Sequence, residues 1–307
     1  NDLLAPLHDG AQFPVSSGRM AFTTDSYVVQ PTFFPGGNIG KLAVCGTVND
    51  LAMNGAVPQY LSCGLILEEG LPFDELEEIL STMADMAKLA NVQIVTGDTK
   101  VVKKGEVDKI YINTAGIGMI PEDIHIGPNF VKPNMDIILS GSIGDHSIAV
   151  MGERFGLELS NSIKTDCAPL NHMVHAVLQE VGPQVTLLRD PTRGGVGTVL
   201  KEIAEQSQVG IKVEESQFVI HDEVKSVCDI LGYDPLYLAN EGKCIFVVDP
   251  TVTDRVLDIL HGFQEGREAT RIGVTMDKNI GKVGLQTSIG GVRLVDLLGE
   301  DQVPRIC

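Results

Sequence analysis

In the first 120 residues, segments with the apolar spacing of a helix alternate with segments typical of strands. Residues 72–90, PFDELEEILSTMADMAKLA, repeat apolar side chains every three or four positions with Glu and Asp between them, which predicts an amphipathic helix. A second helix is predicted over residues 38–55. Apolar and β-branched runs predict strands at 19–30, 58–69, 92–100 and 109–120. Strands and helices in turn are typical of an α/β domain. The apolar stripe of the helix at 72–90 consists of Phe73, Leu76, Ile79, Leu80, Met83, Met86, Ala87 and Leu89.

A polar, proline-marked stretch at residues 121–133 predicts a boundary. The second half opens with a strand at 136–141 and a turn and helix over 142–156. Further helical patterns, with short strands between them, lie at 168–181, 194–206 and 220–231. We therefore expect three parts: an N-terminal α/β domain at 1–125, a C-terminal α/β domain at 126–299, and a flexible tail at 300–307.

The charge balance narrows the classes of ligand. The chain has 307 residues and a formal net charge of −18. Such an acidic protein is unsuited to nucleic acid or to an anionic membrane surface, because both require clustered Lys and Arg. An anionic ligand would have to be met locally by metal ions or backbone N–H groups. No signal peptide or long apolar span is visible, so we expect a cytoplasmic protein with reduced thiols.

The cysteines do not form a zinc motif, but one of them has an unusual position. None of the six lies in a C-x-x-C pair. The chain ends in PRIC, so Cys307 is the last residue, and this ending is not a prenylation box. An exposed thiol oxidises readily unless it is used. The two interpretations are a functional thiol and a disordered tail that happens to end in cysteine.

Aspartates recur in turns and at the predicted ends of strands, where catalytic groups are often displayed. A single Asp in such a place usually caps a helix or closes an Asx turn. Several that converge without basic partners repel one another, and Mg²⁺ would relieve the repulsion while bridging to phosphates. The glycine pairs at 36–37 and 194–195 could offer backbone N–H groups to a phosphate. No P-loop or Rossmann motif is present, so the pattern indicates another kind of metal and phosphate enzyme. The aspartates are Asp25, Asp50, Asp98, Asp145 and Asp190.

Motifs along nearly the whole chain are shared with a known family. The sequence resembles the HypE family of hydrogenase maturation factors in FFPGGNIGKLAVCGTVNDLA, IVTGDTKVV, GDHSIAV, RDPTRGGV, LANEGK and the terminal PRIC. That family belongs to a superfamily with aminoimidazole ribonucleotide synthetase, selenophosphate synthetase and thiamine monophosphate kinase. The resemblance implies a two-domain PurM-like fold. Its N-terminal domain forms a β-barrel-like core in a homodimer, and its C-terminal α/β domain packs beside it. ATP is expected in the cleft between the domains, near the dimer interface.

The resemblance also implies a reaction. The carbamoyltransferase HypF would place a carbamoyl group on Cys307, and this chain would use ATP and Mg²⁺ to dehydrate the S-carboxamide to an S-cyanate. The cyano group would pass through a HypC–HypD complex to the iron of a [NiFe] hydrogenase. Phosphorylation turns the amide oxygen into a good leaving group, and a general base must then remove the nitrogen protons. Cys307 would thus be both the carrier and the site of chemistry.

Site roles follow from the matching motifs. The resemblance assigns Mg²⁺ and the ATP phosphates to the carboxylates of Asp25, Asp50, Asp98 and Asp190. Nucleotide contacts are expected from Asp50, Asp98 and Asp145 and from Gly36, Gly37, Lys41, Asn49, Gly97 and Thr99. Lys41 alternatively belongs to a solvent-exposed helix face.

The residues expected at the reacting group are fewer. Glu241 of LANEGK is the candidate base, since a partly desolvated carboxylate has a raised pKa. Lys100 would offset the charge of the phosphorylated carboxamide. His146 is assigned to proton transfer, and the alternative is a hydrogen-bonded structural histidine. Arg305 is either a residue that draws the tail to the acidic body or a solubilising charge. For Glu241 the alternative is a Glu that closes a turn, and for Lys100 it is a surface Lys.

One departure from the family pattern lies at the start. The family begins with a histidine- and glycine-rich segment over the phosphates, and this sequence begins NDLLAPLHDG. We therefore expect that segment to be missing, which would impair closure over ATP. Two other functions remain open from the residues: a sister enzyme acting on a small metabolite, and a non-catalytic carrier of a one-carbon unit. Selenophosphate synthetase usually has a reactive cysteine near its N-terminus, and none is seen here. The aspartates count against a pure carrier, because a carrier needs no site for Mg-ATP.

Overall fold

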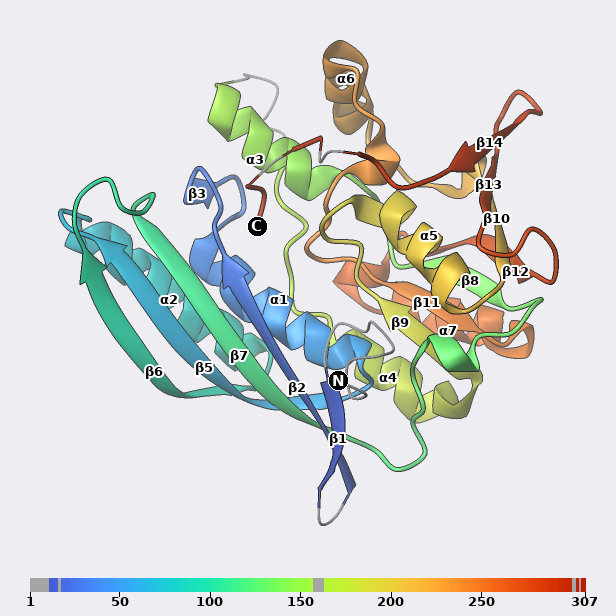
Figure 1. The fold of residues 1–307 in the computed structure, drawn as a ribbon, viewed down its shortest axis with the longest axis horizontal. Helices are drawn as coiled ribbons and strands as arrows, with labels where there is room; N and C mark the ends of the chain where they lie inside the picture. Colours follow the sequence, from blue (N-terminus) through green and yellow to red (C-terminus); the bar gives the residue numbers. More distant parts are fainter. Residues whose placement is uncertain (1–10, 16–17, 157–162, 300–301, 304) are drawn as a thin grey trace.

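The computed structural model describes residues 11–15, 18–156, 163–299, 302–303 and 305–307. The first half of the chain forms a sheet with strand order β1-β2-β7-β5-β6, and two helices cover one of its faces (Figure 1). The helices are α1 (Ile39–Met53) and α2 (Phe73–Leu89). The strands are β1 (Ala11–Val15), β2 (Gly18–Tyr27), β5 (Val57–Glu68), β6 (Gln93–Val102) and β7 (Ile110–Ile120). The short strands β3 (Phe33–Phe34) and β4 (Gly37–Asn38) form a separate ribbon before α1.

The second half is a sheet between two layers of helices. Its strand order is β14-β13-β10-β12-β8-β11-β9. Alternate residues of β8 enter different cores: Ile138 packs with α4 and α7, and Ile137 packs with α5. The strands are β8 (Asp136–Leu139), β9 (Val185–Arg189), β10 (Gly210–Glu214), β11 (Ile245–Val248), β12 (Thr270–Met276), β13 (Val283–Gln286) and β14 (Val292–Val295). The helices are α3 (Asp145–Phe155), α4 (Asn171–Val181), α5 (Gly195–Gln206), α6 (Asp222–Leu231) and α7 (Thr253–His261).

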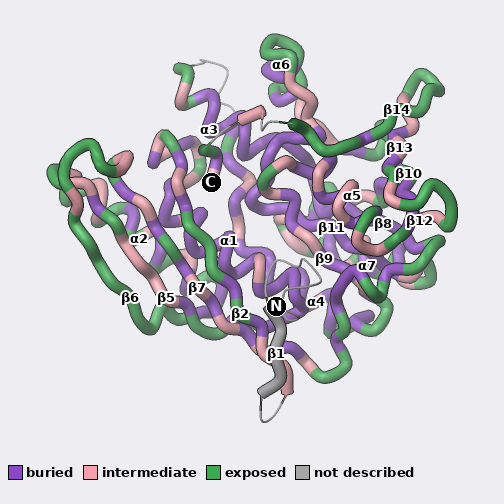
Figure 2. Tube along the Cα trace, viewed as in Figure 1, coloured by how far each residue is buried: buried purple, intermediate pink, exposed green. Residues whose placement is uncertain are grey.

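Helix α1 joins the two halves. Asn38 caps its start, where the side-chain oxygen accepts the backbone N–H groups of Gly40 (2.9 Å) and Lys41 (3.1 Å). The helix is buried on nearly every side, as the continuous buried trace in Figure 2 shows. Residues at its end, such as Leu51, pack in the same apolar cluster as Val174 of α4. One core therefore continues across both halves. It holds the loops of one half in place against the loops of the other.

The helices and strands predicted up to residue 231 are present, with ends shifted by a few residues. The predicted apolar stripe of α2 is too wide, because the helix buries only Ile79, Met83 and Ala87. Phe73 is 88% exposed and Leu89 is 55% exposed. The helix lies over the outer part of the sheet, so one row of side chains is enough to cover it. Strands β11–β14 and helix α7 follow the last predicted helix.

The end of the tail is docked against the body. The backbone N–H of Val28 donates to the carbonyl of Cys307 (3.2 Å), and that of Gln30 donates to the carbonyl of Arg305 (3.4 Å). Ile306 is only 4% exposed. Figure 1 shows the C-terminus among α1, α3 and β3. The expected flexible tail is thus docked at its last three residues, which bond to the segment that follows β2. Residues 1–10 and Pro304, on which other expectations rest, lie outside the described residues.

No helix in the described part of the chain is long and apolar enough to cross a membrane.

Candidate active site

The C-terminal cysteine lies in a cavity that both halves of the chain build. Its volume is about 240 Å³. Asp25 comes from β2, Asp50 from α1, Asp190 from the loop after β9, and Glu241 from the loop before β11. The lining residues are Thr23, Thr24, Asp25, Gly46, Asp50, Asp190, Thr192, Arg193, Glu241 and Cys307. Five residues predicted for the site from sequence, namely Asp25, Asp50, Asp190, Glu241 and Cys307, are therefore gathered in one place.

A hydrogen bond joins two residues that line this cavity, one on β2 and one on α1. The hydroxyl of Thr23 donates to Asp50 Oδ2 at 2.7 Å. Thr23 and Asp25 are two residues apart on the strand, so their side chains share the face that α1 covers. This local geometry explains why TTDSYV and GTVNDLA, which are far apart in the sequence, contribute carboxylates to the same cavity.

Glu241 has a carboxylate without a full set of partners. Its side chain is 4% exposed, and its Oε1 has no hydrogen-bond partner among the described residues. Burial raises its pKa well above the usual value, and the negative charges of Asp190, Asp166 and Asp25 raise it further. A buried polar atom normally finds a partner. An unsatisfied carboxylate oxygen in the Cys307 cavity is therefore suited to accept a proton from a group on that thiol.

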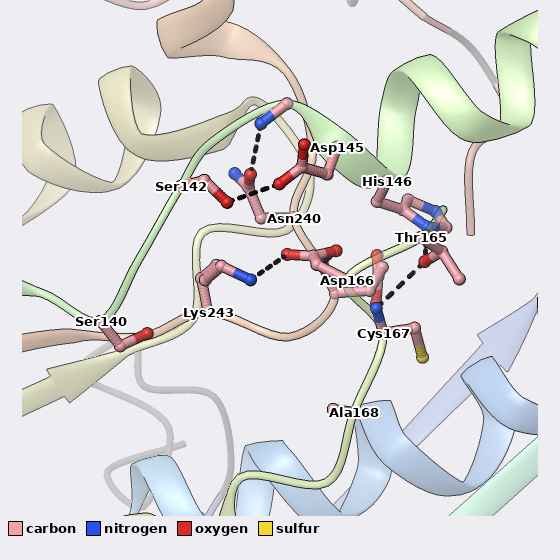
Figure 3. Close-up of polar contacts among 12 residues, drawn as sticks. Ser140, Ser142, Asp145, His146, Thr165, Asp166, Cys167, Ala168, Asn240 and Lys243 are labelled. Carbon is pink, nitrogen blue, oxygen red and sulfur yellow. Dashed lines mark hydrogen bonds and ion pairs between the residues drawn. The ribbon is translucent and has the colours of Figure 1, made fainter. Parts of the chain in front are cut away.

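The backbone of Glu241 is held in place from both halves of the molecule. Its N–H donates to Asp166 Oδ1 (3.1 Å), and its carbonyl accepts from the side chain of Asn49 (3.4 Å). Lys243 pairs with Asp166 Oδ2 at 3.2 Å (Figure 3). Burial works against ionisation of Asp166, but the charge of Lys243 leaves its pKa below the usual value. The predicted nucleotide contact Asn49 is thus a link between the halves, since it also accepts the N–H of Leu170 (2.8 Å).

Gly242 makes this arrangement possible, and its replacement by alanine tests it. A Cβ at residue 242 would lie 1.8 Å from the carbonyl oxygen of Asp166. Gly242→Ala should therefore push the Glu241 loop away from Asp166 and destabilise the protein by about 1–3 kcal/mol. Thermal unfolding measures the effect. Gly64→Ala is the matched control, because its nearest contact would be an ordinary 3.8 Å. Equal melting temperatures for the two variants would contradict the argument.

Arg193 is a cation of this cavity that sequence reasoning missed. It lies in RDPTRGGV just before α5, and the following Gly194 and Gly195 have φ angles of +74° and +61°. Such angles favour glycine and turn the chain sharply into the helix. Among the described residues that line the cavity, Arg193 is the only Lys or Arg, facing four carboxylates. The motif predicts a role for its aspartate, and nothing in its spacing marks the arginine.

The thiol of Cys307 is held in its neutral form. Burial raises its pKa, and the nearby charge of Glu241 raises it further, while Arg193 acts in the opposite direction. Because the thiolate is the nucleophile, the docked thiol is a weak one. The docked geometry is therefore better suited to chemistry on a group already attached to sulfur than to attachment itself.

Asp145 and His146 lie at the start of α3 and do not line this cavity. Asp145 accepts from Ser142 Oγ (2.5 Å), which closes a turn (Figure 3). It also contacts His221 Nδ1 (2.8 Å), which links α3 to the start of α6. His146 is fully buried and bonds to Thr165 Oγ1 (2.8 Å) and to the carbonyl of Ile306 (2.9 Å). The structure supports the alternative of a hydrogen-bonded structural histidine over proton transfer.

The predicted phosphate-binding glycines face the second half instead. Gly36 and Gly37 lie beside Thr165, whose N–H donates to the carbonyl of Pro35 (2.9 Å). The ammonium of Lys41 donates to the carbonyl of Gly36 (3.0 Å). In this chain these three residues stabilise the turn before α1 and do not line the Cys307 cavity.

Two of the residues predicted on β6, Asp98 and Lys100, lie on the opposite face of the first sheet from Asp25. Asp98 is in register with Gly64, which is in register with Asn113. The Asn113 side chain bonds to Ser26 Oγ (3.0 Å) on the outer face, whereas the next residue, Thr114, bonds to the carbonyl of Ala43 in α1 (2.8 Å). Asp98 therefore shares the outer face, and Lys100, two residues on, does too.

These outer residues neutralise each other. Lys100 pairs with Asp98 at 2.9 Å, and its hydrogen bond lowers the pKa of Asp98. Gly97 and Thr99 line a groove between β6 and α2. A single chain thus does not bring Gly97, Asp98, Thr99 and Lys100 to the cavity with Cys307, contrary to the expected single cluster.

The carboxylates do not form a ready metal centre. No group of three or more His, Cys, Asp or Glu side chains among the described residues converges to hold an ion. Asp25, Asp50 and Asp190 nevertheless offer oxygen ligands to one cavity. Mg²⁺ commonly takes only one or two carboxylates and completes its shell with water and substrate phosphates. The donor set fits a metal that arrives with a nucleotide rather than a resident one.

Comparisons with known proteins decide the family. The models for the N-terminal and C-terminal domains of AIR synthase related proteins match residues 8–120 and 132–286. The carbamoyl dehydratase HypE of Rhizobium leguminosarum bv. viciae is 48% identical over 308 residues, covering 100% of this chain and 88% of that protein. The chain belongs to the HypE family of carbamoyl dehydratases.

Solved structures of HypE proteins have the same fold. A HypE–HypF complex contains a chain with a TM-score of 0.92 and 44% identity, covering 97% of this chain and 96% of that one. A HypE in complex with ATP has a TM-score of 0.91 and 45% identity, covering 100% of this chain and 92% of that one. The predicted α/β PurM-like fold, the HypE resemblance and the prediction of an enzyme in hydrogenase maturation are confirmed. A sister enzyme or a non-catalytic carrier is therefore not favoured.

Proposed function

We propose that this HypE-family chain dehydrates an S-carbamoyl group on its own Cys307 to an S-cyanate, using ATP, and so supplies the cyanide ligand for the iron of a [NiFe] hydrogenase. The observation that carries the proposal is the shared cavity: Cys307 and the unsatisfied Oε1 of Glu241 line it together. The ATP complex of a 45% identical HypE supports the co-substrate.

The reaction balances without a further reactant. The carbamoyl oxygen takes the terminal phosphoryl group of ATP, and ADP leaves. The C–O bond then breaks with release of phosphate, the two nitrogen protons depart, and the C–N bond becomes a triple bond. Glu241 would accept a nitrogen proton, which general base catalysis requires. Arg193, which lines the same cavity, would oppose the negative charge that develops on the oxygen.

Mg²⁺ would be held by Asp25, Asp50 and Asp190, and it would neutralise phosphate charge. The chain's own residues have a second task, which is to keep the reacting group dry. The cavity is small, and Ile306 and Ala239 pack in the same apolar cluster below it. Exclusion of water strengthens every electrostatic contact in the site and protects the cyanate from hydrolysis.

Loading and dehydration should occur with the tail in different places. The docked thiol has a raised pKa and is a poor nucleophile. We therefore infer that HypF carbamoylates the tail away from the cavity, in line with the HypE–HypF complex of a 44% identical relative. Transfer of the cyano group to a HypC–HypD complex would again require release of the tail.

A homodimer would give Asp98 and Lys100 on β6 a role. The outer face of the first sheet carries exposed apolar side chains, including Phe22 (40%), Tyr60 (46%) and Ile66 (41%). A second copy of the chain packed against this face would bury them and cover Asp98 and Lys100. These two residues would then contribute at the interface, where a single chain leaves them paired with each other.

The intact mass of the chain tests the proposed function. The protein would be incubated with carbamoyltransferase, carbamoyl phosphate and ATP, purified, and then given fresh Mg-ATP alone. We expect a carbamoyl adduct on Cys307 that loses one water in the second step. An adduct that forms and then stays unchanged would reject the dehydratase and leave a carrier.

A further inference from the structure

The docked tail is held by side chains of α3 that lie outside the cavity. The segment at residues 305–307 runs beside residues 28–30, to which it bonds through the carbonyls of Arg305 and Cys307. The carbonyl of the residue between them, Ile306, instead accepts from His146 Nε2 at 2.9 Å.

The hydrogen-bond chain fixes the protonation of His146. A carbonyl only accepts, so Nε2 must carry the proton. Nδ1 then accepts from the hydroxyl of Thr165 (2.8 Å), and that hydroxyl accepts the N–H of Cys167 (3.0 Å) (Figure 3). Burial lowers the pKa of His146, which agrees with a neutral ring. Both nitrogens are occupied, so the ring is available to hold the tail and not to exchange protons with the thiol.

Arg154 holds the neighbouring peptide group. It lies about two turns further along α3, and one of its terminal nitrogens donates to the carbonyl of Arg305 at 2.7 Å. Its Nε donates to the carbonyl of Gln30 at 2.7 Å. One planar guanidinium therefore ties the tail and residue 30 of the first half to a helix of the second half. A lysine could not bridge both carbonyls in this fixed geometry.

We propose that His146 and Arg154 are positioning residues for the dehydration step, holding the carbonyls of residues 305 and 306 so that the group on Cys307 stays beside Glu241. The proposal rests on the proposed function, because it assigns the docked tail to dehydration. Both bond to backbone carbonyls of the tail, and neither is among the described residues that line the Cys307 cavity. Their loss should leave ATP binding unchanged and should lower the rate at which bound ATP is used.

We call the contacts of His146 and Arg154 with the tail carbonyls the latch. Alkylation of Cys307 tests the latch without any assumption about the reaction. Iodoacetamide would be added to the full chain, and labelling of the C-terminal peptide followed by mass spectrometry over time. His146→Leu and Arg154→Met each remove a bond to the tail, and each should speed labelling roughly tenfold. His172→Leu and Arg255→Met are matched controls, since His172 Nε2 also bonds to a carbonyl (2.9 Å) and Arg255 pairs with Glu180 far from the tail.

Single-turnover dehydration links the latch to chemistry. Chains carbamoylated on Cys307 with cyanate would be mixed with Mg-ATP, and loss of water followed by mass. We expect both variants to dehydrate roughly tenfold more slowly at unchanged ATP affinity. His146→Gln should restore both properties, because its amide can donate to Ile306 and accept from Thr165.

The outcomes separate the two proposals. Unchanged labelling of both variants would show that these residues do not hold the tail. Faster labelling with an unchanged dehydration rate would show that holding the tail does not position the reacting group. Either result overturns the latch. Wild-type chain that never dehydrates would instead reject the proposed function, and the labelling rates would still decide whether the latch exists.

Discussion

Replacement of Cys307 by alanine is expected to abolish the conversion of carbamoyl to cyano completely. The sulfur is the atom that carries the substrate, so no other side chain can replace it within the 240 Å³ cavity. ATP binding should persist, because the carboxylates of the cavity remain. Intact mass should show no stable carbamoyl adduct at the C-terminus, and ATP hydrolysis should no longer respond to carbamoyltransferase and carbamoyl phosphate.

The chain provides a matched control for this variant. Cys63 is a partly buried thiol on β5, beside Leu65 and Thr99 in the groove between β6 and α2. Cys63→Ala should leave the mass shift and its timing unchanged. Cyanation of the Cys307→Ala chain, or its loss in the Cys63→Ala chain, would place the reactive sulfur elsewhere.

The fold was largely predictable because its elements follow local rules. The apolar residues of α1 predict a helix, and Asn38 marks its start because its side chain caps the first turn. The width of the α2 stripe was not predictable, since it depends on how much of the sheet the helix covers. The same limit applies to the sheet of the second half, where strands such as β8 and β11 are buried on both faces and carry no alternation.

The motifs predicted the residues that share the Cys307 cavity, but not the position of those on β6. Asp25, Asp50, Asp190, Glu241 and Cys307 meet in the cavity. The residues on β6 could not be placed from motifs, because the face of a strand depends on register. Asp98 is in the row of Asn113, not in the row of Thr114, and a shift by one residue would reverse the result.

Other roles needed three-dimensional contacts. His146 matched a motif, yet its partners are Thr165 and Ile306, 19 and 160 residues away along the chain. Arg154 and Arg193 show no periodicity or spacing that marks them. The contacts of a side chain with a backbone carbonyl at the end of the chain leave no pattern in the sequence, so the latch became visible only in the folded protein.

Glu241→Gln is expected to slow dehydration by about 10²–10⁴-fold, the usual contribution of a general base, with ATP binding retained. The amide keeps the shape of the side chain but cannot accept a proton. Single-turnover mass measurements on carbamoylated chain would follow the reaction. Glu180→Gln, which removes an exposed carboxylate paired with Arg255, is the control. Normal turnover of Glu241→Gln would remove this residue from the mechanism.

The same variant should also be more stable than the wild type at neutral pH. Glu241 is buried, and its pKa is raised above its value in the unfolded chain by burial and by the charges of Asp190, Asp166 and Asp25. The folded state therefore binds a proton more tightly than the unfolded state. Wild-type stability must fall as pH rises from the unfolded pKa of about 4.3 through the raised folded pKa.

The substitution removes that dependence, so the stability difference should grow with pH. At neutral pH we expect a gain of about 1–3 kcal/mol, the desolvation penalty of an unsatisfied buried group. Below about pH 4 the carboxyl is protonated in both states of the wild type, and the two unfolding free energies should converge. Denaturant unfolding across this pH range gives the comparison. A gain in unfolding free energy at neutral pH together with lost turnover would show that the protein keeps a destabilising carboxylate because the reaction needs a base there. Equal stabilities at every pH would mean that Glu241 meets water or a cation in solution and is not a desolvated base.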